Sequence, residues 1–172
     1  IVSKTDLKGQ ITYINRDFME ISGFSEDELI GRSHNIVRHP DMPVEAFEDF
    51  WVALKENRPW VGLVKNRCKN GDFYWVVAHA TPIIENGQVI GYMSVRRKAE
   101  PAQIKEAEAA YALFRNGKAG GRKIINGQVR TQGLLSGLGA RLAGLSLATR
   151  AALAATVALA VILGAGSLIM RD

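Results

Sequence analysis

Two polar segments in the first 80 residues carry the side chains needed to bind a small molecule. The segment 33–43 places Arg38, His39 and Asp41 within four positions, on a loop that Pro40 and Pro43 stiffen. Arginine presents a planar fork of donors that suits phosphate and carboxylate groups, so this loop is typical of a binding edge. The alternative is a charged loop that only caps the following helix, a role that Asp41 also fits.

Asn66 belongs to the second segment, a predicted strand over residues 60–69. Side chains alternate between the two faces of a strand. One face carries Val61, Leu63, Lys65, Arg67 and Lys69, and the other carries Trp60, Gly62, Val64, Asn66 and Cys68. Because three cations in a row favour water, we expect the face with Asn66 to point into the domain. A buried amide without a partner costs about 1–3 kcal/mol, so either a protein group or a bound ligand must satisfy it. Gly62 on the same face leaves space that a side chain would otherwise fill.

Metal and catalytic chemistry find little support in this sequence. His34 and His39 stand five residues apart on a proline-broken loop, which is no metal-site spacing, and the single cysteine, Cys68, excludes a disulfide framework or a Cys-rich metal site. The chain has no dinucleotide-binding glycine motif and no acid–base pair beside a substrate cavity. We therefore predict that the protein binds no metal, has no catalytic residue and is not an enzyme.

The elements that position these residues predict an α+β domain. A strand at residues 10–14 precedes two short helices, the first begun by Asn15 and ended by Gly23, the second begun by the capping box Ser25–Glu28. Residues 43–57 form an amphipathic helix. Strands at residues 60–69, 73–84 and 88–97 follow, joined by Asn70-Gly71 and Asn86-Gly87. This order indicates an antiparallel sheet with short helices on one face.

Charge divides the chain into different regions. Residues 1–95 hold 10 Lys and Arg against 13 Asp and Glu, whereas residues 96–150 hold 11 against 3 and residues 151–170 hold none. The uncharged run would span roughly 30 Å as a helix, the thickness of a bilayer core. A buried Ala-rich core helix is the alternative, and the pattern does not separate a single pass from half of a hairpin.

The basic stretch before the uncharged run predicts the orientation. Basic segments beside a span stay in the cytoplasm, so we expect the N-terminal domain there. Contact with anionic lipid is favoured over nucleic-acid binding, because the basic stretch lacks interleaved aromatic residues. The predicted organisation is an N-terminal α+β domain over 1–98, an amphipathic linker helix over 99–118, a basic juxtamembrane linker over 119–149 and a transmembrane segment over 150–171. The linker helix, which begins at Pro101, either packs on its own sheet or forms a dimer contact.

Several motifs carry a family resemblance. The element order with Asn15-Arg-Asp-Phe, Gly23-Phe-Ser, Lys69-Asn-Gly-Asp72 and Gly91-Tyr is similar to PAS sensor domains. The runs 35–43, 59–67 and 69–75 resemble, more narrowly, the PAS domain of the bacterial aerotaxis receptor family. The resemblance covers residues 1 to 98, and the order of sensor, basic linker and span continues it.

This resemblance implies a PAS fold that binds FAD without a covalent bond and signals in aerotaxis from the cytoplasmic face of the inner membrane. Asn66 would hydrogen-bond the isoalloxazine ring, and Arg38, His39 and Asp41 match the family's cofactor loop. The other residues at matching cofactor-binding positions are Asn15, Phe47, Trp51, Trp60, Tyr74 and His79. His79 replaces an expected Asn, so we expect the cavity wall to differ there.

Partners follow from the same resemblance: a homodimer, the lipid bilayer, and a downstream HAMP and chemotaxis signalling module on missing sequence or on another chain. Residues 31–38 lack the cysteine that related flavin photoreceptors need for adduct chemistry. A PAS module used only for docking or dimerisation, or a sensor of another small ligand, is the alternative function.

Overall fold

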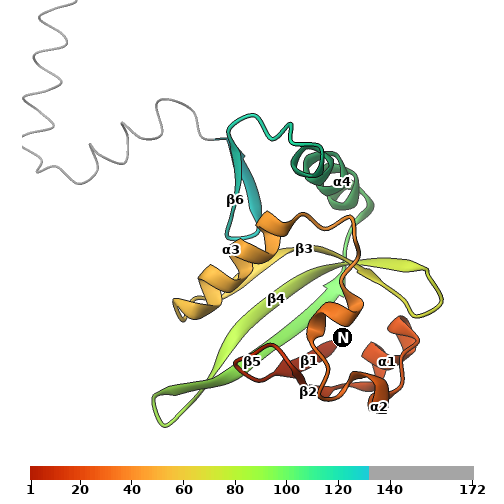
Figure 1. Ribbon diagram of the computed structural model, residues 1–172, viewed down its shortest axis with the longest axis vertical. Coiled ribbons are helices and arrows are strands. Elements are labelled where there is room, and N and C mark those ends of the chain that lie inside the picture. The colour runs from red at the N-terminus through yellow and green to blue at the C-terminus, as the bar shows by residue number, and fades with distance from the viewer. Residues whose placement is uncertain (132–172) are drawn as a thin grey trace, which may run out of the picture. The chain divides into compact units, whose positions relative to one another are not determined.

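A five-stranded antiparallel sheet lies at the centre of the region described by the structure, a computed structural model in which residues 1–131 are described. The strands follow the order β2-β1-β5-β4-β3 across the sheet (Figure 1). They are β1 (Val2–Thr5), β2 (Ile11–Ile14), β3 (Trp60–Arg67), β4 (Phe73–Glu85) and β5 (Gln88–Lys98). The predicted β3–β4–β5 meander is confirmed, and Asn86 and Gly87 take φ values of 50° and 78°, as a tight hairpin turn requires. Strand β1 was not predicted.

Short helices follow β2, and their ends agree with the capping residues. Helix α1 (Arg16–Ser22) begins where the side chain of Asn15 accepts a hydrogen bond from the Phe18 amide at 3.3 Å, and it ends at Gly23 in the left-handed conformation. Helix α2 (Glu26–Leu29) begins with the Ser25 amide donating to Glu28 at 3.0 Å. A 3₁₀ turn, η1 (His34–Val37), and helix α3 (Val44–Lys55) complete this layer.

Helix α4 (Pro101–Arg115) packs against Trp75, which is paired with Lys65 and so lies on the face of the sheet opposite to Asn66. The Tyr111 hydroxyl donates to the Leu63 carbonyl at 2.8 Å, and its ring stacks on Trp75 with centroids 6.2 Å apart. Ala107 and Phe114 are buried beside it. Of the two roles considered for this helix, packing on its own sheet is therefore the one observed.

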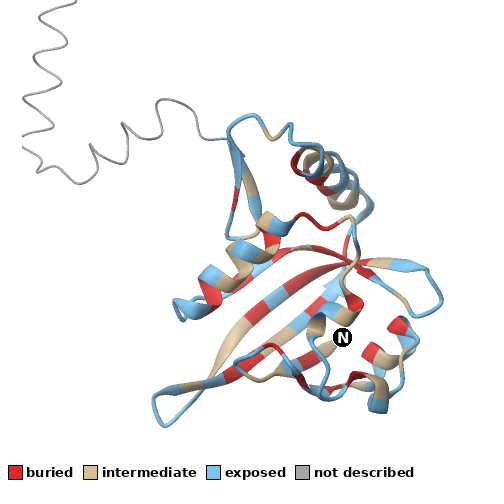
Figure 2. Cartoon of the chain, in the orientation of Figure 1, coloured by how far each residue is buried: buried red, intermediate tan, exposed pale blue. Residues whose placement is uncertain are grey.

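A second, two-stranded sheet follows α4 and was not predicted. Strands β6 (Arg122–Ile125) and β7 (Gln128–Thr131) form a hairpin whose Ile124 is buried in the same hydrophobic cluster as Trp60 and Tyr111. In Figure 1 the hairpin stands next to α3, with which β6 is in contact. Figure 2 shows buried positions along the central strands and on the helices. No helix within residues 1–131 is long and apolar enough to cross a membrane, and the predicted span at 150–171 lies outside the described residues.

Candidate functional site

A cleft in which about 70 Å³ is open to the centre of a water molecule lies between the sheet and the layer formed by η1 and α3. Strands β3, β4 and β5 form its floor, and α3 forms one wall. Of the residues singled out from the sequence, Asn66, Trp51, Arg38, Phe47 and Trp60 line this cleft. The alternation along β3 therefore identified the inward face correctly.

Asn66 lies at the end of β3 and is only 3% exposed. Its backbone forms an isolated bridge with Arg38, which brings the loop before α3 onto the edge of the sheet. Its side-chain nitrogen, Nδ2, is buried and has no hydrogen-bond partner among the described residues. A buried amide nitrogen without a partner is a costly feature, and here it faces a cleft rather than packed side chains.

Arg96 is a buried cation in the same cleft, 7% exposed, that the sequence analysis did not single out. It donates from its two terminal nitrogens to Ser3 Oγ at 3.0 Å and to His34 Nε2 at 2.8 Å. Burial lowers the pKa of Arg96 to about 10, so it stays charged at neutral pH. Burial first, and then the charge of Arg96, lower the pKa of His34 to about 3, so the imidazole is neutral and accepts the bond.

Arg38 is the second cation lining the cleft. Its guanidinium lies 4.2 Å from the centre of the Phe47 ring and donates to the Met42 carbonyl at 3.1 Å. Within residues 1–131 no Asp or Glu lines the cleft. The cleft therefore carries positive charge and favours an anionic ligand.

Aromatic rings make up much of the wall on the α3 side. The Phe50 ring meets Trp51 at 5.0 Å and Trp60 at 5.2 Å between centroids. The expected space at Gly62 is filled by the indole of Trp60, because a Cβ added to Gly62 would lie 2.3 Å from that ring. The glycine thus makes room for a neighbouring tryptophan, and that expectation of an open volume was wrong.

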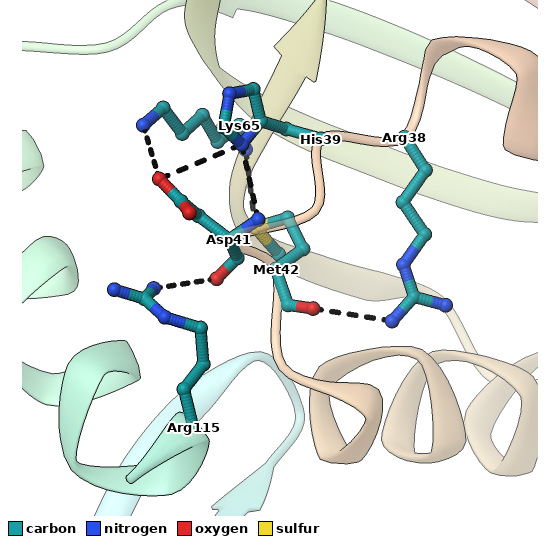
Figure 3. A network of polar contacts seen from close by, with 6 residues as sticks. All are labelled: Arg38, His39, Asp41, Met42, Lys65 and Arg115. Carbon is teal, nitrogen blue, oxygen red and sulfur yellow. Dashed lines mark hydrogen bonds and ion pairs between the residues drawn. The ribbon is translucent and has the colours of Figure 1, made fainter.

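His39 and Asp41 do not line the cleft. The Asp41 amide donates to His39 Nδ1 at 3.0 Å, and the Asp41 carboxylate pairs with Lys65 Nζ at 2.6 Å (Figure 3). Arg115 at the end of α4 donates to the Asp41 carbonyl at 2.7 Å. These contacts tie the loop that carries Arg38 to β3 and α4 from outside the cleft.

Lys65 was expected to face water but is 7% exposed. The ion pair with Asp41 and the Phe73 ring, 4.1 Å from its Nζ, replace solvent around its charge. The hydrogen bond and charge of Lys65 also lower the pKa of Asp41.

Asn15, Tyr74 and His79 also lie outside the residues that line the cleft. Asn15 caps α1 and accepts from the Val2 amide at 2.9 Å, so its oxygen is occupied. His79 is exposed on the opposite face of β4, paired with Val61 and Val95, and the prediction that it forms part of the cavity wall was wrong.

Tyr74 shares the face of Asn66 but is half-buried beyond the cleft. Burial raises the pKa of its phenol to about 12. Within residues 1–131 its hydroxyl has no partner with hydrogen-bond geometry. The amide of Asn66, the residue paired with Tyr74 across the strands, nevertheless lies close enough to oppose this rise in pKa.

Sequence comparison places this architecture among known proteins. A profile of the PAS fold matches residues 11–96, half of the chain. The chain belongs to the PAS-fold family. The aerotaxis receptor of Escherichia coli K12 is 45% identical over 138 residues, which cover 80% of this chain and 27% of the receptor. The nitrogen fixation regulatory protein of Klebsiella pneumoniae is 28% identical over 97 residues, which cover 56% of this chain and 20% of that protein. The matched part of this PAS chain therefore spans about a quarter of the length of the aerotaxis receptor and a fifth of the length of the nitrogen fixation regulatory protein.

Solved PAS structures share the fold. The PAS domain of a Colwellia psychrerythraea protein matches with a TM-score of 0.52 and 25% identity, covering 57% of this chain and 84% of that one. A light-oxygen-voltage domain studied with a flavin analogue matches with a TM-score of 0.56 and 20% identity, covering 68% of this chain and 85% of that one.

Proposed function

We propose that this PAS domain binds FAD non-covalently in the cleft and acts as the redox sensor of an aerotaxis receptor. The unpartnered Nδ2 of Asn66, buried at the floor of a cationic cleft, is the observation that carries the proposal. The relation to the E. coli aerotaxis receptor supports the same ligand, because FAD is the cofactor of the family that the motifs resemble.

The residues that line the cleft fit the chemistry of this dinucleotide. An isoalloxazine ring carries carbonyl and ring-nitrogen acceptors along one edge, which the free N–H groups of Asn66 can meet. Its pyrophosphate is anionic, and Arg38 supplies a guanidinium for it without a competing carboxylate in the described lining. Aromatic rings from α3 offer flat apolar surfaces of the kind that small-molecule sites use.

Non-covalent attachment follows from the place of the thiol. Cys68, the single cysteine, does not line the cleft, and its Sγ donates to the Ile21 carbonyl at 3.2 Å. Burial raises the pKa of this thiol, which keeps it protonated and a poor nucleophile. Met42 and Met93 supply thioethers to the described lining, but it contains no thiol that could form an adduct.

Bound flavin supplies reversible electron transfer, with a change of charge and protonation at its ring. Asn66 and Arg96 are the groups of this chain that are placed to respond, since one donates hydrogen bonds and the other bears a buried charge. The backbone of Asn66 bridges to Arg38, so a change at Asn66 would reach the loop before α3. Arg96 donates to Ser3 and His34, so a change at Arg96 would reach β1 and η1. We assign the domain to sensing rather than to turnover of a substrate.

The membrane setting is part of the proposal and rests on the sequence. Residues 150–171 would anchor the chain in the inner membrane, with the PAS domain in the cytoplasm. A second copy of the chain and a HAMP and chemotaxis module would receive the signal.

The visible spectrum of the purified chain, before and after dithionite, tests the proposal. We expect flavin absorbance that bleaches on reduction, release of FAD rather than another flavin on denaturation, and loss of FAD binding in Asn66→Leu. A folded, colourless protein that takes up no added FAD would contradict it and favour a docking module. Steady NADH oxidation by the chain would instead indicate an enzyme.

A further inference from the structure

The turn of the β6–β7 hairpin is held by a single carboxylate on α3. Asp49 accepts hydrogen bonds from the Asn126 amide through Oδ1 at 2.9 Å and from the Gly127 amide through Oδ2 at 2.7 Å. Arg58 adds a bond to the Asn126 side chain at 2.8 Å. The hairpin is therefore docked through its turn as well as through the buried Ile124.

The same carboxylate also contacts the wall of the cleft. Trp60 Nε1 donates to Asp49 Oδ2 at 2.7 Å, and Trp60 lines the cleft while being 1% exposed. One oxygen atom thus accepts from both the indole of the cleft and the turn of the hairpin. Asp49 itself does not line the cleft.

The backbone of β3 reinforces this connection. A Cβ added to Gly127, whose φ is +74°, would lie 1.9 Å from the Val61 carbonyl oxygen. The turn therefore rests directly on the residue that follows Trp60. Trp60 and the turn are therefore joined twice, through the Asp49 carboxylate and through the backbone next to Trp60.

We infer that Asp49 is a positioning residue that links the place of the Trp60 indole in the cleft to docking of the β6–β7 hairpin. The inference rests on the proposed function in one respect, that FAD is the occupant to which Trp60 responds. Because Trp60 fills the space above Gly62, an occupant that reaches this part of the cleft must either pack against the indole or displace it. Thermodynamic linkage is reciprocal: the factor by which docking of the hairpin changes the affinity for FAD equals the factor by which bound FAD changes the docking equilibrium.

Gly127→Ala in the full chain tests the link from the hairpin side, because the added Cβ forces the turn away from Asp49 and Val61. Gly87→Ala is the matched control: it also follows an asparagine in a hairpin turn, with φ of +78°, but its Cβ would meet nothing within 4 Å. The readout is the indole ¹H–¹⁵N signal of Trp60, assigned by its loss in Trp60→Phe. We expect this signal to shift, and its exchange with solvent to accelerate, in Gly127→Ala and in Asp49→Asn but not in Gly87→Ala.

A second arm measures FAD affinity in the same variants. We expect Gly127→Ala to weaken FAD binding by about fivefold or more, within the range of typical allosteric coupling, and Gly87→Ala to leave it unchanged. An unshifted Trp60 signal in folded Gly127→Ala overturns the link whatever the affinity for FAD. Wild-type protein that binds no FAD while the signal shifts refutes the proposed function and leaves the contact between Asp49, Trp60 and the hairpin established.

Discussion

Asn66→Leu should stabilise the flavin-free chain while it abolishes FAD binding. The Nδ2 of Asn66 is buried without a partner within residues 1–131, so removing it relieves a cost of about 1–3 kcal/mol. Leucine is similar in length and faces a cleft, so it adds apolar burial without compressing packed neighbours. The free energy of unfolding should therefore rise by about 1–3 kcal/mol, which moves the urea midpoint upward by roughly 1 M.

The assay compares urea unfolding of flavin-free wild type and Asn66→Leu, followed by titration of each with FAD. Gln88→Leu, at an exposed amide on β5, serves as the control and should change stability by less than about 0.5 kcal/mol. A midpoint that stays level or falls in Asn66→Leu would show that the amide is already satisfied in the free protein. Full retention of FAD by the variant would remove Asn66 from the binding site.

Three further outcomes follow from the contacts described above. Lowering the pH from 7 to 5 should destabilise the chain by about 2 kcal/mol through His34. Burial holds the pKa of His34 at about 3 and unfolding returns it to 6.5, so the unfolded state binds more protons in this pH window. His34→Gln should remove this part of the pH dependence of urea unfolding, and an unchanged pH dependence would assign it to other groups. Tyr111→Phe deletes the bond to the Leu63 carbonyl and should lower the free energy of unfolding by about 1 kcal/mol in thermal melts, unlike Tyr13→Phe at an exposed ring. Arg115→Ala removes the hydrogen bond to the Asp41 carbonyl and loosens the loop there, so it should weaken FAD binding about two- to fivefold, the equivalent of roughly 0.5–1 kcal/mol. Equal affinity for FAD in Arg115→Ala and in the surface control Lys105→Ala would show that this hydrogen bond does not affect the cleft.

Local rules predicted the elements whose signals lie within a few residues. The Asn15 and Gly23 caps, the Asn86-Gly87 turn and the alternation along β3 depend on neighbouring residues alone, and the structure confirms each. Strand β1 gave no comparable signal, because four residues show little periodicity and its pairing with β5 joins positions far apart in the chain. Asn126-Gly127 is a turn dipeptide like Asn86-Gly87, but the strands beside it have four residues each and carry no clear alternation, so the hairpin was not predicted.

The site was harder to predict wherever a side chain depends on long-range packing. Arg96 is followed by two more cations, so the sequence did not show which of them points inward. Lys65 is buried because Asp41 and Phe73, from other elements, meet it. Motif matching placed His39 and Asp41 in the cofactor loop, and the contacts of that loop show that they act from its outer side.

The shared core of the sheet and α4 bears on where this chain can be cut. A shortened version ending at Lys98, the last residue of β5, would lose Ala107, Tyr111 and Phe114 from the hydrophobic cluster that contains Trp75. The uncovered indole and its neighbours on that face would form an apolar patch open to water, which promotes self-association. Recombinant fragments intended for crystallisation or spectroscopy should therefore extend at least through Thr131, so that the helix and the hairpin keep this surface covered.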